Sequence, residues 1–183
     1  DMTQERTELT TPLCENDIKS LKAGDMVYIS GKIYTARDAA HKRLSELIEE
    51  GVEMPFDFNG AVVFYAGPCP AKPGRPIGSV GPTTSGRMDL YSPKLIERGL
   101  KFMIGKGLRS KEVSDAIVEN RGLYFAAIGG AAALMAKCVV SAQVIAFEEL
   151  GTEAVRELIV KDMPVIVAID SEGNDIYKQR KSL

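Results

Sequence analysis

The segment from Ser79 to Asp89, Ser-Val-Gly-Pro-Thr-Thr-Ser-Gly-Arg-Met-Asp, carries the side chains best suited to chemistry in this chain. Its glycines, hydroxyl residues and arginine lie close together: Gly81, Thr83, Thr84, Ser85, Gly86 and Arg87. Glycine lets a backbone turn tightly and approach a ligand. Hydroxyl and backbone N–H groups bind anions, and an arginine grips a carboxylate or phosphate in a fixed plane. The segment therefore predicts an anion-binding loop, although a turn rich in small polar residues would share this composition.

A second basic residue, Arg37, lies in the run Thr-Ala-Arg-Asp-Ala-Ala-His, between a predicted strand and a predicted helix. Apolar residues after it recur at three- and four-residue spacing up to Gly51, as in an amphipathic helix. Thr35 and Asp38 have the spacing of a capping box, so we expect the helix to begin between them. Arg37 would then stand in the first turn, where an anion could join the free backbone N–H groups. The alternative is a surface arginine paired with Asp38 or Glu46.

A third basic residue, Lys106, lies between Gly105 and Gly107, directly after the apolar stretch 100–104. A lysine flanked by glycines at the end of a strand is exposed to whatever the loop binds. The segment is not a phosphate-binding P-loop, because no serine or threonine follows the lysine directly. No Gly-x-Gly-x-x-Gly pattern follows a predicted strand either, so a dinucleotide site is not expected.

The composition of the chain narrows the class of protein. With 183 residues, 45% hydrophobic and 26% charged, we expect a single domain spanning residues 1–183 with a substantial core. A net charge of -2 leaves no broad basic face for nucleic acid. No apolar run approaches the roughly 20 residues that span a membrane, and no signal-peptide pattern is present. We therefore expect a cytoplasmic protein.

The cysteines and the one histidine do not form a recognisable site by themselves. Cys14, Cys69 and Cys138 are widely spaced and form no Cys-x-x-Cys pair. They are typical of reduced thiols and not of a zinc or iron–sulfur set. His41 falls on the predicted helix beside Ala40, so it could pack or cap there, and a Ser-His-Asp site is not favoured.

The elements that must position the basic residues alternate between strand and helix. Strands are predicted over 26–29, 32–34, 61–65, 100–104, 123–127 and 139–147. Helices are predicted from a start between Thr35 and Asp38 to near Gly51, near 110–119 and over 130–137. The end of the chain, over 155–160, 164–169, 172–174 and 176–177, is predicted to be β-structure with a turn. This order predicts an α/β fold with a parallel central sheet, a second antiparallel layer and helices. The loops would then meet at the strand ends, and the proline-rich stretch 67–76 is expected to be a long active-site loop.

Three of these motifs together resemble one known family. Thr-Ala-Arg-Asp-Ala-Ala-His, Gly-Pro-Thr-Thr-Ser-Gly-Arg-Met-Asp and Ile-Gly-Lys-Gly occur in this order and are similar to the C-terminal, or β, part of the iron–sulfur class I fumarate hydratases. The β subunits of L-tartrate dehydratases look similar but less close. The similarity runs from about Thr10 to Tyr177. It implies a swivelling β/β/α domain and a hydro-lyase that interconverts (S)-malate and fumarate.

The resemblance also implies a role for each matching residue. Arg37, Arg87 and Lys106 would hold the carboxylates of a small dicarboxylate substrate, with Thr84 and Gly81 also binding it. Thr83 would be the catalytic base that removes the C3 proton of malate. Cations placed beside the reacting carboxylate would stabilise the charge that builds there. A threonine is a poor base unless another group takes its proton, and in the family a carboxylate of the other domain is implicated.

The resemblance covers only the C-terminal part of the single-chain family members, so we expect their other domain to be absent from this chain. The resemblance therefore implies the β subunit of a hetero-oligomer with an α subunit, for which an α2β2 assembly is one arrangement. The [4Fe–4S] cluster, whose open iron would bind the leaving hydroxyl as a Lewis acid, is expected on that α subunit, with no metal in this chain.

Other functions remain open at the level of sequence. Within the same class, the substrate could be L-tartrate or a methylated diacid such as mesaconate. In a different class, the chain could be a stand-alone anion-binding module without chemistry. A nucleotide-binding module comes third, because it lacks any phosphate-loop signature.

Overall fold

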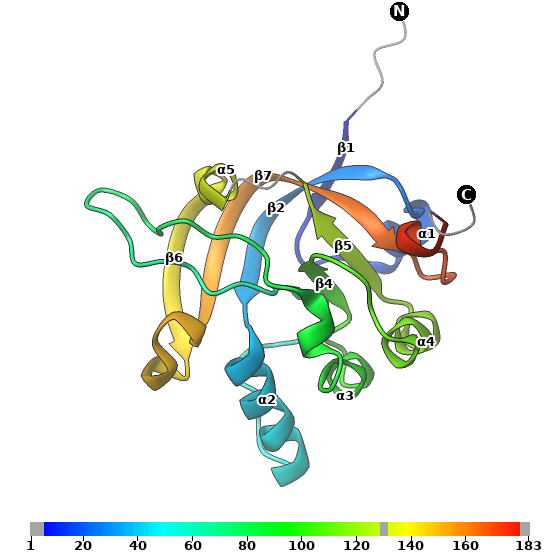
Figure 1. Ribbon diagram of the computed structural model, residues 1–183, viewed down its shortest axis with the longest axis horizontal. Coiled ribbons are helices and arrows are strands. Elements are labelled where there is room, and N and C mark those ends of the chain that lie inside the picture. Colours follow the sequence, from blue (N-terminus) through cyan, green and yellow to red (C-terminus); the bar gives the residue numbers. More distant parts are fainter. Residues whose placement is uncertain (1–5, 129–131, 180–183) are drawn as a thin grey trace, which may run out of the picture.

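A computed structural model describes residues 6–128 and 132–179 (Figure 1). The strands are β1 (Thr7–Thr10), β2 (Met26–Thr35), β3 (Val62–Phe64), β4 (Phe102–Gly105), β5 (Leu123–Ala127), β6 (Val139–Ala146) and β7 (Val155–Ile169). The α-helices are α1 (Glu15–Ser20), α2 (Asp38–Glu50), α3 (Ser92–Glu97), α4 (Lys111–Asn120), α5 (Ala132–Lys137) and α6 (Ile176–Gln179). Two 3₁₀ helices are η1 (Ser85–Met88) and η2 (Glu148–Glu153). No described helix has the length and apolar character needed to cross a membrane.

The strands form one sheet that closes on itself. The order is β1-β2-β3-β4-β5-β7-β6, and a further pairing of β2 with β7 joins five of the strands into a ring. Strands β1 to β5 are parallel to one another, whereas β7 runs antiparallel to β2, β5 and β6. The α/β class and the parallel strands are confirmed. The separate antiparallel layer is wrong, because the long strand β7 bridges the two edges of the parallel strands.

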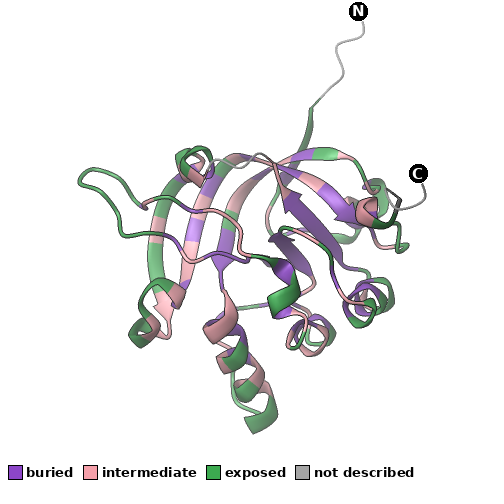
Figure 2. Ribbon diagram, in the orientation of Figure 1, coloured by how far each residue is buried: buried purple, intermediate pink, exposed green. Residues whose placement is uncertain are grey.

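Two apolar cores lie on opposite faces of the curved sheet. Alternate residues of a strand enter different cores: Phe102 and Ile104 of β4 pack in one, and Met103 packs in the other. The second core receives the buried sides of three helices, α2, α3 and α4, through residues such as Leu44 and Ile117. These helices lie along one side of the sheet (Figure 1), and the strands between the cores are largely buried (Figure 2).

The start of α2 differs from the predicted capping box. Strand β2 continues to Thr35, whose hydroxyl accepts a hydrogen bond from the backbone N–H of Arg156 at 3.3 Å. Thr35 therefore cannot cap the helix. The cap residue is Arg37, which makes no side-chain cap, and a carboxylate oxygen of Glu153 accepts the hydrogen bond from the Ala39 N–H at 3.1 Å. The predicted end of the helix is confirmed by Gly51, whose φ of 71° is left-handed.

The remaining differences between the predicted and observed elements concern the bounds or type of particular strands and helices. The predicted strands 26–29 and 32–34 form one continuous strand, β2. The predicted strands 155–160 and 164–169 likewise form one strand, β7. Residues 176–177 begin the helix α6 instead of a strand. The predicted helix from 130 to 137 is described only from Ala132, because 129–131 lie outside the described residues.

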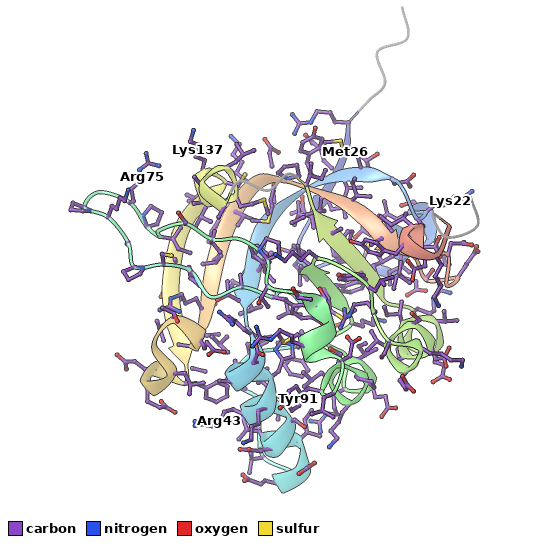
Figure 3. The ribbon with its side chains drawn as sticks, viewed as in Figure 1. Lys22, Met26, Arg43, Arg75, Tyr91 and Lys137 are labelled. Atoms are coloured by element: carbon purple, nitrogen blue, oxygen red, sulfur yellow. The ribbon has the colours of Figure 1, made fainter. Side chains whose placement is uncertain are left out.

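The stretch 67–76, predicted to be an active-site loop, approaches Arg37 at its base. Gly67 lies against the side chain of Arg37. The tip projects away from α2, as the labelled positions of Arg75 and Arg43 show (Figure 3). The base of the loop therefore borders Arg37.

Candidate active site

The three predicted basic residues follow three neighbouring parallel strands. Arg37 comes after β2, and Lys106 comes directly after β4. Between them, the segment 79–89, called the Thr83 loop below, is held at the end of β3. There the backbone N–H of Thr83 donates to the carbonyl oxygen of Tyr65 at 2.7 Å. The site therefore lies at the carboxyl ends of β2, β3 and β4, the place where open α/β proteins bind ligands.

The Thr83 loop and the Lys106 loop are joined by their backbones. Thr84 and Lys106 form an isolated parallel bridge, and the N–H of Ser85 donates to the carbonyl oxygen of Lys106 at 2.9 Å. The side chains of Thr84 and Lys106 are exposed, and Thr83 is half-buried. The bridge thus places exposed Thr84 and exposed Lys106 opposite each other, with Thr83 next in the chain.

Ser85 is different from the two threonines, because it is a buried anchor. Its hydroxyl oxygen accepts a hydrogen bond from the Lys106 N–H at 2.9 Å and lies 2.7 Å from the hydroxyl of Tyr124. Burial raises the pKa of Tyr124, so this hydroxyl keeps its proton. A side chain at Gly105 would collide with the Ser85 hydroxyl, which explains the glycine there. Ser85 therefore fixes the loop and does not present its hydroxyl to a ligand, contrary to the sequence-based interpretation.

Arg37 and Arg87 are brought together by one carboxylate. Asp38 Oδ2 lies 2.9 Å from Arg87 Nε, and Asp38 Oδ1 lies 3.6 Å from Arg37 Nε. Arg37 Nε also lies 3.7 Å from Glu153 Oε1. The Arg37 side chain is 28% exposed and that of Arg87 is 57% exposed, so both can still reach a ligand. The predicted pairing of Arg37 with Asp38 is present, and Glu46 takes no part in these contacts.

Gly81 has a packing reason to be glycine. A Cβ atom there would lie 3.1 Å from the Cβ of Ala132 at the start of α5. The N–H of Val80 donates to the carbonyl oxygen of Ala132 at 3.2 Å. The close approach of α5 thus accounts for Gly81, whereas contact with a substrate stays a prediction.

A buried arginine stands behind the site, and sequence analysis did not single it out. Arg109 is fully buried at its side chain, and its Nε donates to Asp89 Oδ1 at 2.7 Å. Its Nη2 lies 3.1 Å from the Tyr65 hydroxyl, and its guanidinium stacks 4.7 Å from the ring centre of Tyr124. Because Tyr65 and Tyr124 hold Thr83 and Ser85, this arginine supports the loop from inside. Only its position two residues after the Gly-Lys-Gly run 105–107 could have drawn attention to it.

His41 packs and does not face a ligand. Its ring is buried, lies edge-on to the Tyr65 ring at 5.0 Å, and has Nδ1 2.8 Å from the carbonyl oxygen of Arg37. Because a carbonyl can only accept, Nδ1 carries the proton. Burial lowers the pKa of His41 to about 4, against the opposing effect of that hydrogen bond. The neutral imidazole thus holds the backbone of Arg37 in place.

Acidification should destabilise the protein through His41. Its folded pKa lies below the ordinary unfolded value, so the stabilisation is present above about pH 6.5 and is lost as the pH falls toward the folded value. Between pH 7 and 5 we expect a loss of about 2 kcal/mol in the free energy of unfolding. Urea titrations at both pH values would measure it. His41→Gln, which does not titrate, should show a smaller pH-dependent loss; an equal loss would assign the effect to other groups.

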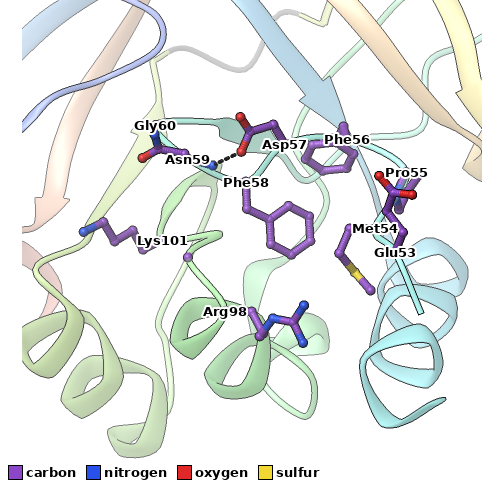
Figure 4. A pocket seen from close by; sticks show the side chains of 11 residues that line it. Glu53, Met54, Pro55, Phe56, Asp57, Phe58, Asn59, Gly60, Arg98 and Lys101 are labelled. Atoms are coloured by element: carbon purple, nitrogen blue, oxygen red, sulfur yellow. Dashed lines mark hydrogen bonds between the residues drawn. The ribbon is translucent and has the colours of Figure 1, made fainter. Parts of the chain in front are cut away.

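A cavity lies at the opposite ends of the strands. About 730 Å³ in volume, it is lined by residues 53–60 together with Arg98, Gly99 and Lys101, as Figure 4 shows. These segments precede β3 and β4, so they lie at the amino ends of the strands. Lys101 Nζ already donates to the carbonyl oxygen of Asn120 at 2.9 Å. This cavity is therefore separate from the site of Arg37 and Thr83.

The residues of the described ranges do not fit an iron–sulfur cluster. Cys14 and Cys69 are exposed and Cys138 is partly buried. Within residues 6–128 and 132–179, no three histidine, cysteine or acidic side chains come together as metal ligands would. No step of the chemistry is therefore assigned to a cluster held by this chain.

Comparison with known proteins identifies the family. The family model described as "Fumarase C-terminus" matches residues 1–180. A protein of Methanocaldococcus jannaschii assigned as L(+)-tartrate dehydratase subunit beta is 42% identical over 173 residues, which cover 91% of this chain and 89% of that protein.

Single-chain relatives match only in part of their length. "Fumarate hydratase class I, anaerobic" of Escherichia coli is 40% identical over 82% of this chain and 28% of its own. "Fumarate hydratase 2" of Leishmania major is 35% identical over 97% of this chain and 32% of its own. This chain thus spans about a third of the fumarate hydratases it matches. With the family model covering nearly every residue, the chain belongs to the fumarase C-terminus family.

Proposed function

We propose that this chain is the β subunit of an iron–sulfur hydro-lyase that interconverts (S)-malate and fumarate plus water. Arg37, Arg87 and Lys106 bind the two carboxylates, and Thr83 is the catalytic base. The observation that supports this most is the meeting of these residues at the carboxyl ends of β2, β3 and β4. Membership of the fumarase C-terminus family agrees with it.

The arrangement suits proton removal beside a carboxylate. When the C3 proton of malate leaves, negative charge builds on the neighbouring carboxylate, and cations already in place stabilise that charge. Thr83 directly precedes Thr84, whose backbone is bridged to that of Lys106, and the exposed side chains of Thr84 and Lys106 can orient the diacid. A threonine needs another group to take its proton, and we assign that group to a carboxylate of the companion chain.

The companion is an α subunit that carries the [4Fe–4S] cluster. This chain spans about a third of the fumarate hydratases named above, and we assign the part of those proteins outside the match to the companion chain. A swivelling β/β/α domain would turn the exposed faces of Arg87 and Lys106 toward that companion. Substrate would then be held between the two chains.

L-tartrate dehydration is the second candidate. The Methanocaldococcus jannaschii protein favours this candidate. The match covers 91% of this chain and 89% of that protein, so the two chains are of similar length. Both reactions remove water from a hydroxylated C4 diacid, so the same arginines and lysine would serve either substrate.

Co-expression with a candidate α subunit tests the proposal. Assayed without oxygen, the pair should hydrate fumarate, and rates with L-tartrate and mesaconate would rank the alternatives. This chain alone should be inactive and free of a cluster, because its cysteines are not gathered and Thr83 lacks its companion carboxylate. Iron-loaded, active protein from this chain alone would refute the two-chain assignment.

Arg37→Lys should weaken the assembled enzyme although it keeps the charge. Lysine lacks the planar fork, so we expect kcat/KM to fall by an amount equivalent to roughly 1–3 kcal/mol, the range for a charge-assisted hydrogen bond. Steady-state kinetics with fumarate would measure it. Arg43→Lys is the matched control, because Arg43 lies on the same helix but pairs with Glu149. If Arg37→Lys behaves like Arg43→Lys, Arg37 does not bind a carboxylate.

A further inference from the structure

Asp38 lies between the two arginines of the candidate site. Its two carboxylate oxygens point to different partners, Oδ2 to Arg87 Nε at 2.9 Å and Oδ1 to Arg37 Nε at 3.6 Å. Arg37 comes from the start of α2, whereas Arg87 comes from η1, about fifty residues later in the chain. One side chain thus connects the two loops that contribute cations.

The ordinary role of an aspartate at this position is already filled. An acidic residue in the first turn of a helix commonly caps backbone N–H groups. Here Glu153 accepts the hydrogen bond from the Ala39 N–H at 3.1 Å. No hydrogen bond from Asp38 to the start of α2 is present in the described part of the chain.

The contact between Asp38 and Arg37 leaves buried polar atoms without hydrogen bonds, which lowers the stability of the folded protein. Asp38 Oδ1 and Arg37 Nε are both buried atoms without a hydrogen-bond partner within the described residues. An unpaired buried polar atom lowers stability, and each such atom in a folded protein calls for a physical reason. Attraction between opposite charges across 3.6 Å holds the pair without satisfying either atom.

We infer that Asp38 is a positioning residue for substrate binding, which orients Arg37 and Arg87 together through their Nε atoms. This leaves the terminal nitrogens of both guanidinium groups for the substrate. Arg87 gains most, because its side chain is 57% exposed and a free arginine must lose rotamer freedom to bind. The inference rests on the proposed function for the identity of the ligand, but the coupling of the arginines does not depend on it.

Side-chain dynamics test the coupling without any assay of activity. In the full chain, the ¹⁵Nε heteronuclear NOE of Arg87, assigned by its loss in Arg87→Lys, should fall in Asp38→Asn. Glu149→Gln is the matched control, because it breaks the ion pair of Arg43 on the same helix and leaves Arg37 and Arg87 alone. An Arg87 NOE unchanged by Asp38→Asn would overturn the inference.

Kinetics of the assembled enzyme test the consequence. At about 0.5 M salt, where the screening length is only a few ångströms, Asp38→Asn should raise KM for fumarate about tenfold, as expected for one oriented ionic contact. The kcat should change much less. In Arg87→Lys, which already lacks the Nε contact, the same substitution should add little. A KM that is unchanged or lower in Asp38→Asn, or full additivity with Arg87→Lys, would overturn the inference. If wild type acts on none of the diacids, the proposed function fails, and the NOE still decides the role of Asp38.

Discussion

Thr83→Ala in the assembled enzyme is expected to lower kcat by about 10²–10⁴-fold, the range typical of general acid–base catalysis. KM should change little, because Arg37, Arg87 and Lys106 still hold the diacid. The backbone N–H of Thr83, which anchors the loop to Tyr65 at 2.7 Å, is kept in the variant. Steady-state kinetics with malate and fumarate would measure both constants.

Thr84→Ala is the matched control for this experiment. Thr84 is the same residue type, adjacent and exposed, and is predicted to bind or position only. Ser85 cannot serve, because its hydroxyl is buried and holds the backbone of Lys106. Arg87→Ala should impair substrate binding as well as kcat. Equal losses in Thr83→Ala and Thr84→Ala would indicate a structural loop, and a near-normal Thr83→Ala would move the base to the companion chain.

Asp89→Asn is expected to have a large effect on stability. It removes the charge that faces fully buried Arg109 at 2.7 Å, while Asp89 itself is 14% exposed. Breaking a buried ion pair by removing one partner costs about 3–5 kcal/mol, so the free energy of unfolding should fall by that amount. Equilibrium urea denaturation at pH 7 would measure it.

An exposed ion pair provides the control for this second experiment. Lys111 and Asp115 lie 2.7 Å apart on the surface of α4, with most of the lysine side chain in solvent. Solvent-exposed pairs contribute little, so Asp115→Asn should leave the unfolding midpoint unchanged. If Asp89→Asn left the free energy of unfolding as unchanged as Asp115→Asn, water would have to reach Arg109. The Asp89–Arg109 pair would then contribute less to holding the Thr83 loop than its geometry indicates.

The local elements were largely predictable from the sequence, because each carries its own pattern. The strand 123–127 was predicted with the bounds that β5 has. Ser110 caps α4 by accepting from the Val113 N–H, close to the predicted start of that helix. The gathering of Arg37, Arg87 and Lys106 followed from their places after successive strands.

Long-range contacts could not be predicted in the same way. Closure of the sheet depends on β2 pairing with β7, for example Val27 opposite Val165, and no local periodicity encodes that pairing. The predicted cap of α2 is wrong for the same reason, because the group that accepts from the Ala39 N–H is the distant Glu153 and not Thr35. The burial of Ser85 under Tyr124 is likewise set by another strand, so the local sequence does not distinguish its hydroxyl from those of Thr83 and Thr84.

The function of Thr83 is the central claim, and proton exchange tests it most directly. Wild-type and Thr83→Ala enzymes, each assembled with the α subunit, would be incubated with malate in D₂O, and deuterium at C3 would be followed by NMR. Wild type should incorporate one deuterium at C3, whereas Thr83→Ala should do so at least about 100-fold more slowly while still binding the diacid. Deuterium incorporation at the wild-type rate in Thr83→Ala would show that another group removes the proton.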